Sequence, residues 1–151
     1  MTKNKKMKKI LYLNLVLLLF ISCKAQKIIE MEQNSKEIIK STTMEIADYK
    51  PFYKIENVWI ENDILKIKIS FTGNKNIPEF TLIWNGALMK SLPPKAVLVL
   101  QPNSNAIPTG KKQVNMTLSF DLNPLKETNY NEIVLLIKDY STQLHYKPIK
   151  N

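Results

Sequence analysis

Residues 65–71 read LKIKISF and decide the fold, because apolar and polar side chains alternate strictly along them. Leu65, Ile67, Ile69 and Phe71 fall on one side of an extended chain, and the two lysines and the serine fall on the other. A period of two predicts a β-strand with one face in a core and one face in water. The search for neighbouring elements therefore starts from a sheet.

The flanking sequence continues the strand pattern. Residues 53–61 form the preceding strand-like run, and Asn62-Asp63 separates the two runs with residues that tolerate the positive φ of a tight hairpin turn. Asn85-Gly86 predicts a second turn, and Asn123-Pro124-Leu125 a short helical turn. The other predicted strands are Glu79 to Trp84, Ala96 to Gln101, Val114 to Phe120, Glu132 to Lys138 and Gln143 to Lys147.

Seven or eight short strands with no long amphipathic helix predict an all-β domain. The expected architecture is an antiparallel two-sheet sandwich of the immunoglobulin-like type, and the alternative is a small β-barrel. We place this domain at residues 43–151. Residues 23–42 are polar and mixed in charge, so we interpret them as a tether with room for an edge strand or a helical turn. Residues 1–22 have a different character.

The N-terminus has the features of an export signal. Five lysines between residues 3 and 9 precede an apolar run from Ile10 to Ile21, which is shorter than the roughly 20 residues that a spanning helix needs. Phe20-Ile21-Ser22-Cys23 follows and resembles the lipobox of bacterial lipoproteins, although leucine is more usual than phenylalanine at its first position. Residues 1–22 are therefore predicted to be a lipoprotein signal peptide.

The lipobox resemblance implies that Cys23 is the lipid attachment site and the first residue of the mature chain. Acyl chains, palmitate among them, would then hold the protein in the bilayer, and two or three chains anchor stably where one does not. Lys24 follows the cysteine, where an aspartate would resemble an inner-membrane retention signal, so the resemblance implies the outer membrane with the domain facing the periplasm. The alternative is ordinary cleavage after Ala25, which would leave a soluble periplasmic or secreted protein.

The charge balance argues against nucleic acid as a partner. The net charge is +9, but five of these charges precede residue 23, which leaves +4 for the remainder. Every basic residue is a lysine, so the bidentate guanidinium fork that reads phosphates and base edges is absent. A single cysteine also excludes an internal disulfide.

Three blocks of the sequence resemble a known group of proteins. They are residues 80–100 (FTLIWNGALMKSLPPKAVLVL), 118–122 (LSFDL) and 144–148 (LHYKP). These blocks are similar to uncharacterised small lipoproteins of Gram-negative bacteria with a β-sandwich-like domain. The shared residues belong to predicted strands and turns, so the resemblance implies a fold and a cellular location but no activity.

Residues that could carry catalysis are few. His145 is the only histidine, so a metal site is not expected, and in a terminal strand a surface role suits it better than that of a general base. Glu56, Glu61 and Asp63 form the closest carboxylate group, but two of them flank a predicted turn where acidic residues are ordinarily solvated. No phosphate-binding glycine motif is present. We expect no cofactor and no catalytic residue.

The aromatic residues are the remaining candidates for binding. Trp84 is expected in the core, Trp59 either in the core or on the surface, and Tyr130 and Tyr140 on exposed loops. The interpretation that follows is a membrane-anchored periplasmic binding or accessory module, not an enzyme, whose partner is another envelope protein. The alternatives are a hydrolase of envelope glycans or peptides and an inhibitor or immunity-like protein.

Overall fold

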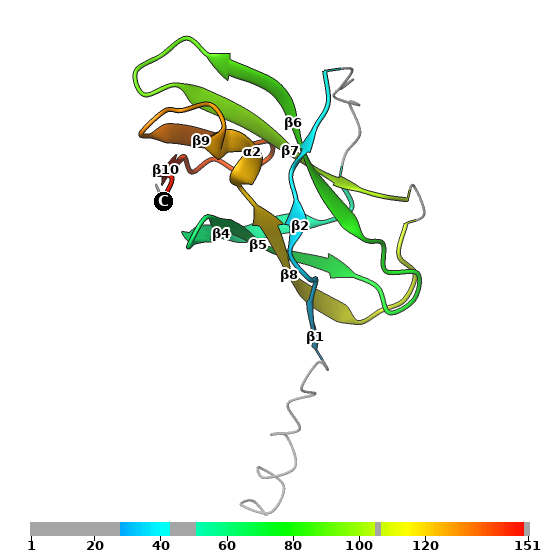
Figure 1. Ribbon diagram of the computed structural model, residues 1–151. Helices are drawn as coiled ribbons and strands as arrows, with labels where there is room; N and C mark the ends of the chain where they lie inside the picture. The colour runs from blue at the N-terminus through cyan, green and yellow to red at the C-terminus, as the bar shows by residue number, and fades with distance from the viewer. Residues whose placement is uncertain (1–27, 43–50, 105–106, 150–151) are drawn as a thin grey trace, which may run out of the picture.

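The computed structural model describes residues 28–42, 51–104 and 107–149, which fold into two packed β-sheets (Figure 1). The elements are β1 (Ile29–Glu32), β2 (Lys36–Glu37), β3 (Ile39–Lys40), β4 (Lys54–Glu61), β5 (Ile64–Thr72), β6 (Phe80–Met89), β7 (Lys95–Pro102), β8 (Gln113–Asp121), α2 (Asn123–Lys126), β9 (Ile133–Ile137) and β10 (Leu144–Tyr146). One sheet has the order β1-β8-β5-β4, with β2 also paired to β8. The other has the order β10-β9-β7-β6-β3.

The predicted two-sheet sandwich is confirmed, and the sheets do not close into the alternative barrel. The prediction of purely antiparallel sheets is wrong, because both sheets are mixed. β1 and β2 run parallel to β8, β3 runs parallel to β6, and β7 runs parallel to β9. Parallel neighbours require connections that leave the sheet, as between β7 and β9, where the chain passes through β8 of the other sheet. The alternation of side chains carries no information about strand direction.

Two predicted turns had different outcomes. Asn62 and Asp63 have φ angles of 49° and 65° and join β4 to β5, as the sequence predicts. Asn85-Gly86 does not end its strand: β6 continues to Met89, and its pairing with β7 shifts register between Trp84 and Leu88. Gly86 provides the φ of 79° that this irregularity needs, so the glycine marks a bulge within a strand and not a chain reversal.

The core lies between the sheets and is filled from both. Leu65, Ile67 and Ile69 of β5 are fully buried, which confirms the inward face predicted from their alternation. Trp84 is buried as expected, and its indole Nε1 donates to the Ala87 carbonyl at 2.9 Å. No buried side-chain nitrogen or oxygen among the described residues lacks a hydrogen-bond partner. Packing without unpaired polar groups is what stabilises this disulfide-free domain.

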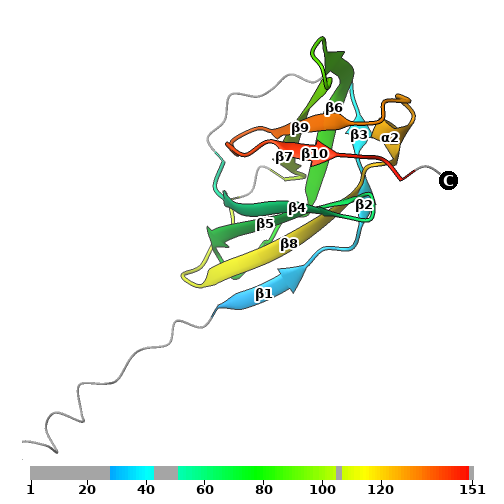
Figure 2. The same cartoon turned by 90° about the vertical axis from the view of Figure 1, so that its left-hand side faces the viewer.

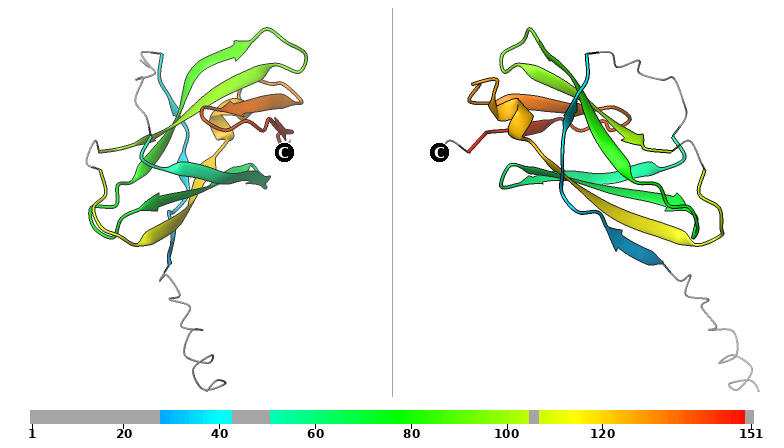
Figure 3. Two further views of the ribbon diagram at one scale, coloured as in Figure 1. Left: turned by 180° about the vertical axis from the view of Figure 1, so that it is seen from behind. Right: turned by 45° about the vertical axis from the view of Figure 1, so that its right-hand side comes forward.

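The N-terminal segment crosses from one sheet to the other (Figure 3). β1 and β2 extend the first sheet beside β8, and β3 then pairs with β6 at the edge of the second sheet. Ile38, between them, is only 3% exposed. The segment interpreted as a tether therefore contains the edge strand allowed for it, and its residues 29–40 take part in the sandwich.

Candidate functional site

A polar groove of about 450 Å³ opens on the outer face of the first sheet. One wall comes from the end of β1 and the residues that follow it, and the other comes from the β4–β5 hairpin. The floor is the solvent-facing side of β5 and β8, where Lys66 and Ser119 are cross-strand partners. The lining residues are Glu32, Gln33, Asn34, Ser35, Glu61, Asn62, Ile64, Lys66 and Ser119.

Charged groups of both signs face this groove. The Lys66 ammonium lies 3.4 Å from Glu32 Oε1, and Glu61 Oε1 accepts a hydrogen bond of 2.8 Å from the indole of Trp59. The volume is within the usual range for small-ligand sites, but those sites are lined mostly by apolar side chains. Carboxylates, an ammonium, amides and hydroxyls instead suit a ligand or a protein surface that offers hydrogen bonds and charge.

Gln33 fixes the first wall of the groove. Its backbone N–H donates to the Thr117 carbonyl of β8 at 2.9 Å. Its side chain makes a pair of bonds with Phe80 of β6: Nε2 donates to the Phe80 carbonyl at 3.2 Å, and Oε1 accepts from the Phe80 N–H at 3.0 Å. A single buried residue thus joins both sheets through three hydrogen bonds, and the exposed Asn34 and Ser35 are held beside it.

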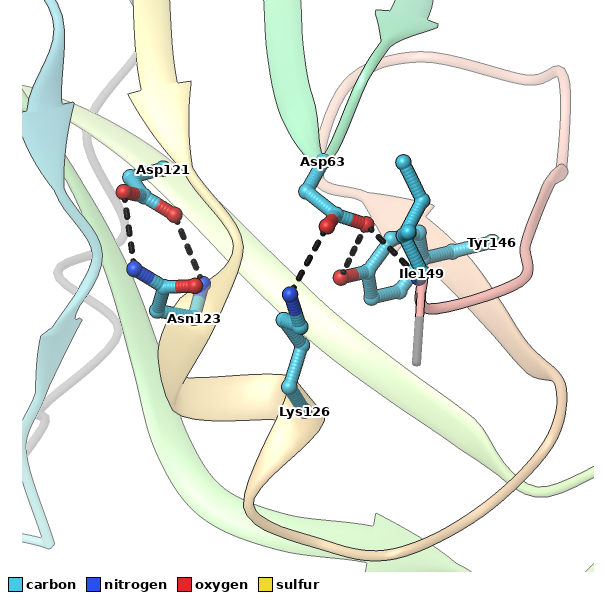
Figure 4. A network of polar contacts seen from close by, with 6 residues as sticks. All are labelled: Asp63, Asp121, Asn123, Lys126, Tyr146 and Ile149. Carbon is cyan, nitrogen blue, oxygen red and sulfur yellow. Dashed lines mark hydrogen bonds and ion pairs between the residues drawn. The ribbon is translucent and has the colours of Figure 1, made fainter. Parts of the chain in front are cut away.

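Asp63 fixes the second wall (Figure 4). Its carboxylate accepts hydrogen bonds from Lys126 Nζ at 2.9 Å, from the Tyr146 hydroxyl at 3.0 Å and from the Ile149 N–H at 3.2 Å. The side chain of Asp63 is only 12% exposed. The turn of the β4–β5 hairpin is therefore tied to α2 and to the C-terminal chain, and the expectation that this acidic residue is solvated is wrong.

The pKa of Asp63 reports the balance of these contacts. Burial raises the pKa, but the hydrogen bonds from Lys126, Ile149 and Tyr146 outweigh burial, so the net pKa lies below the ordinary value of 3.8. Burial is also the main reason why the pKa of Tyr146 is raised, with the bond to Asp63 adding to the effect. Asp63 is thus an ionised carboxylate that accepts hydrogen bonds from the Tyr146 phenol and from Lys126. This arrangement stabilises the fold and does not prepare Asp63 to act as a general acid.

The three predicted carboxylates do not form one cluster. Glu56 accepts hydrogen bonds from Lys54 at 2.8 Å and from Ser70 at 2.6 Å, and mainly these two bonds lower its pKa. Asp63 is engaged in the network described above. Of the three, Glu61 alone lines the groove, where the second carboxylate is Glu32. That residue lies in the segment interpreted as a tether, so the sequence analysis missed it; the alternation of Ile29, Glu30, Met31 and Glu32 was the available signal.

His145 is a surface residue, as the sequence predicts. Its Nδ1 lies 2.6 Å from Glu132 Oε1, and this contact is the main cause of the lowered pKa of Glu132. No group of three or more histidine, cysteine, aspartate or glutamate side chains in the described part of the chain is placed to bind a metal ion. Within the same residues, no helix is long and apolar enough to cross a bilayer.

The aromatic candidates are only partly placed as expected. Tyr130 is exposed, but Tyr140 is half-buried and packs against the core, so the prediction of exposure for Tyr140 is wrong. Trp59 is half-buried on β4, with its indole bonded to Glu61 beside the groove. Cys23 and Ala25, the residues of the two alternative processing sites, lie outside the described residues.

Comparison with known proteins gives two distant structural likenesses. No family model and no curated protein matches the chain. A protein of unknown function, DUF1344, from Bacteroides vulgatus matches over 80% of this chain with 15% identity and a TM-score of 0.42. A protein from Parabacteroides distasonis, provisionally named toxin-related, matches over 79% with 19% identity and a TM-score of 0.48. The matches span 55% and 61% of those two longer chains.

Proposed function

We propose that this chain is a binding or accessory module of the cell envelope that holds an envelope partner protein at the groove between β1 and the β4–β5 hairpin. The observation that carries the proposal is the groove itself, whose charged and hydrogen-bonding lining is fixed from both sides by Gln33 and Asp63. A rigid polar recess that keeps charges of both signs in place is suited to recognising a polar protein surface, because little ordering is needed on binding.

The cellular location is the second part of the proposal. Residues 1–22 would direct export, and acylation of Cys23 would retain the domain at the outer membrane, facing the periplasm. Replacing Cys23 with alanine is expected to release the protein from the membrane fraction or to block its processing. An unchanged size and unchanged membrane association of the variant would contradict the lipoprotein assignment and favour cleavage after Ala25.

The binding role is tested by photo-cross-linking in intact cells. A benzoylphenylalanine is introduced at the exposed Asn34 in the groove, and a matched one at Leu92, which is fully exposed in the β6–β7 turn. Cross-linking of one stoichiometric envelope protein from position 34 and not from position 92 is the expected result. Equal adducts from both positions, or none from position 34, would remove the groove as the binding site.

A hydrolase acting on envelope glycans or peptides is the second candidate, because Glu32 and Glu61 line the same groove. We favour binding, since each carboxylate contacts another group of the domain, Glu32 the Lys66 ammonium and Glu61 the Trp59 indole, which is the arrangement of a charged recognition surface. Hydrolysis of envelope material by the purified chain, lost in both Glu32→Gln and Glu61→Gln, would reverse this preference.

A further inference from the structure

One end of the sandwich, which we call the loop end, carries an uncompensated positive charge. It consists of residues 73–78, which follow β5, and residues 107–112, which precede β8. Lys75, Lys111 and Lys112 are exposed there, and these two segments contain no acidic residue. Ile107 is also 70% exposed. Lysine ammonium groups and an exposed apolar side chain are the two kinds of group that contact the phosphates and the interface of an anionic membrane.

The three lysines of the loop end are among the described lysines that form no ion pair, a group that also includes Lys40, Lys68, Lys90, Lys95 and Lys138. Lys36, Lys54, Lys66, Lys126 and Lys147 each lie within 4.0 Å of a carboxylate oxygen. Among the described residues, none of the three loop-end lysines forms such an ion pair. The acidic residue that follows the first segment, Glu79, is itself paired with Lys36 at 2.6 Å. What sets the loop end apart is that three such lysines lie on two neighbouring segments without an acidic residue, which concentrates positive charge there.

The loop end is a built surface. The N–H groups of Asn74 and Lys75 donate to the Thr109 carbonyl at 2.9 and 3.2 Å, and the Gly73 N–H donates to the Lys112 carbonyl at 2.9 Å. Gly110 has a φ of 131°, and a Cβ at that position would lie 1.8 Å from Asn74 Oδ1. The two segments are thus paired through their backbones, and this pairing holds the segments that carry the three lysines side by side.

The start of β1 lies next to the loop end, and this position indicates which partner the loop end contacts. Ile29, the first residue of β1, pairs with Val114, two residues after Lys112. Figure 2 shows the start of β1 beside the segment that leads into β8, with the C-terminus and α2 at the opposite side. Only four residues lie between Cys23 and Ile28, so the five steps from one to the other span at most about 17 Å. An acylated Cys23 therefore keeps this end close to the bilayer.

We propose that the loop end rests on the anionic surface of the membrane that carries the anchor, with Lys75, Lys111 and Lys112 against lipid phosphates. This inference depends on the proposed acylation of Cys23. Each lysine near an anionic membrane raises the occupancy of the bound orientation roughly fivefold. The effect is electrostatic and is screened at high salt. In this orientation the loop end faces the lipid, and the β6–β7 turn, a long strand away, points into the periplasm.

The test uses the full chain, processed by a Gram-negative host and reconstituted through its own anchor into vesicles. Two variants, Ile107→Cys and Leu92→Cys, each add one thiol at an exposed apolar position, and a bimane label on that thiol is quenched by brominated lipids. Vesicles of phosphatidylcholine mixed with phosphatidylglycerol are compared with phosphatidylcholine alone. We expect several-fold stronger quenching at position 107 than at position 92, only with phosphatidylglycerol and only at low salt.

Two controls make the outcome decisive. The combined substitution K75Q/K111Q/K112Q should reduce quenching at position 107 to the level seen at position 92, whereas K90Q in the β6–β7 turn should change nothing. Equal quenching at the two positions, or quenching that ignores phosphatidylglycerol, would overturn the inference. Failure of the anchor is distinguished separately, because a chain without acyl groups, whether it keeps Cys23 or is cleaved after Ala25, would lack the acyl mass in mass spectrometry and would not enter the vesicles.

Discussion

Two sets of hydrogen bonds, which we call the neutral fastening (around Gln33) and the ionic fastening (around Asp63), hold the sheets together, and they differ in charge. On the N-terminal side, Gln33 joins β8 to β6 with neutral hydrogen bonds in a buried position. On the side of the C-terminus, Asp63 joins the β4–β5 hairpin to α2 and β10 through an ionised carboxylate. Neutral bonds do not respond to pH, whereas a carboxylate loses its partners when it is protonated. The two walls of the groove should therefore fail under different conditions.

The largest effect is expected at the neutral fastening. Gln33→Leu keeps the burial but leaves the N–H and the carbonyl of Phe80 without partners, and each buried unpaired group costs about 1–3 kcal/mol. We expect the free energy of unfolding to fall by about 3 kcal/mol with little dependence on pH, as measured by urea denaturation. Gln143→Leu, at an exposed position, is the control and should be almost neutral. A loss under about 1 kcal/mol in Gln33→Leu would mean that the two sheets are held chiefly by packing.

The next effect concerns the ionic fastening. Asp63→Asn keeps a residue that tolerates the positive φ but removes the charge that binds Lys126. Because the folded pKa of Asp63 is lowered, its contribution to stability is present above its unfolded pKa and is lost as the pH falls through the folded pKa. We expect a loss of about 2 kcal/mol at pH 7 that shrinks below about pH 4.

Asp139→Asn is the matched control for this prediction. Asp139 also has a positive φ, of 66°, in the turn between β9 and β10, but its side chain is exposed. The control should leave unfolding unchanged at every pH. If Asp63→Asn were destabilised equally at pH 7 and pH 3, the carboxylate charge would have no part in holding the hairpin.

The sequence predicted the strands better than the groove, for a physical reason. The alternation in residues 65–71 and 114–120 depends only on which side of one strand meets the core, so it is readable locally. The groove needs residues 32–35, 61–66 and 119 to meet, and that depends on the parallel pairing of β1 with β8. Nothing in the local pattern encodes that pairing. Asp63 was misjudged likewise, because its partners Lys126 and Tyr146 are distant in sequence.

The smallest effect on stability, and the most specific effect on function, is expected between the two fastenings. Lys66→Met removes the cation from the groove floor but keeps an unbranched side chain on β5. Its ion pair with the exposed Glu32 contributes at most about 1 kcal/mol, so unfolding should change little. Cross-linking from position 34 should nevertheless fall strongly, because Lys66 is the only cation among the described residues that line the groove.

Lys68→Met supplies the comparison, since Lys68 lies on the same outer face two residues further along β5 and does not line the groove. Both substitutions remove one charge from the same strand, so they alter the net charge and the strand propensity equally. Loss of cross-linking in Lys66→Met alone would assign recognition to the groove. An equal loss of cross-linking in both variants would instead mean that the partner responds to the overall charge of the outer face of this sheet. Gln33 and Asp63 would then stabilise the fold without forming a binding site.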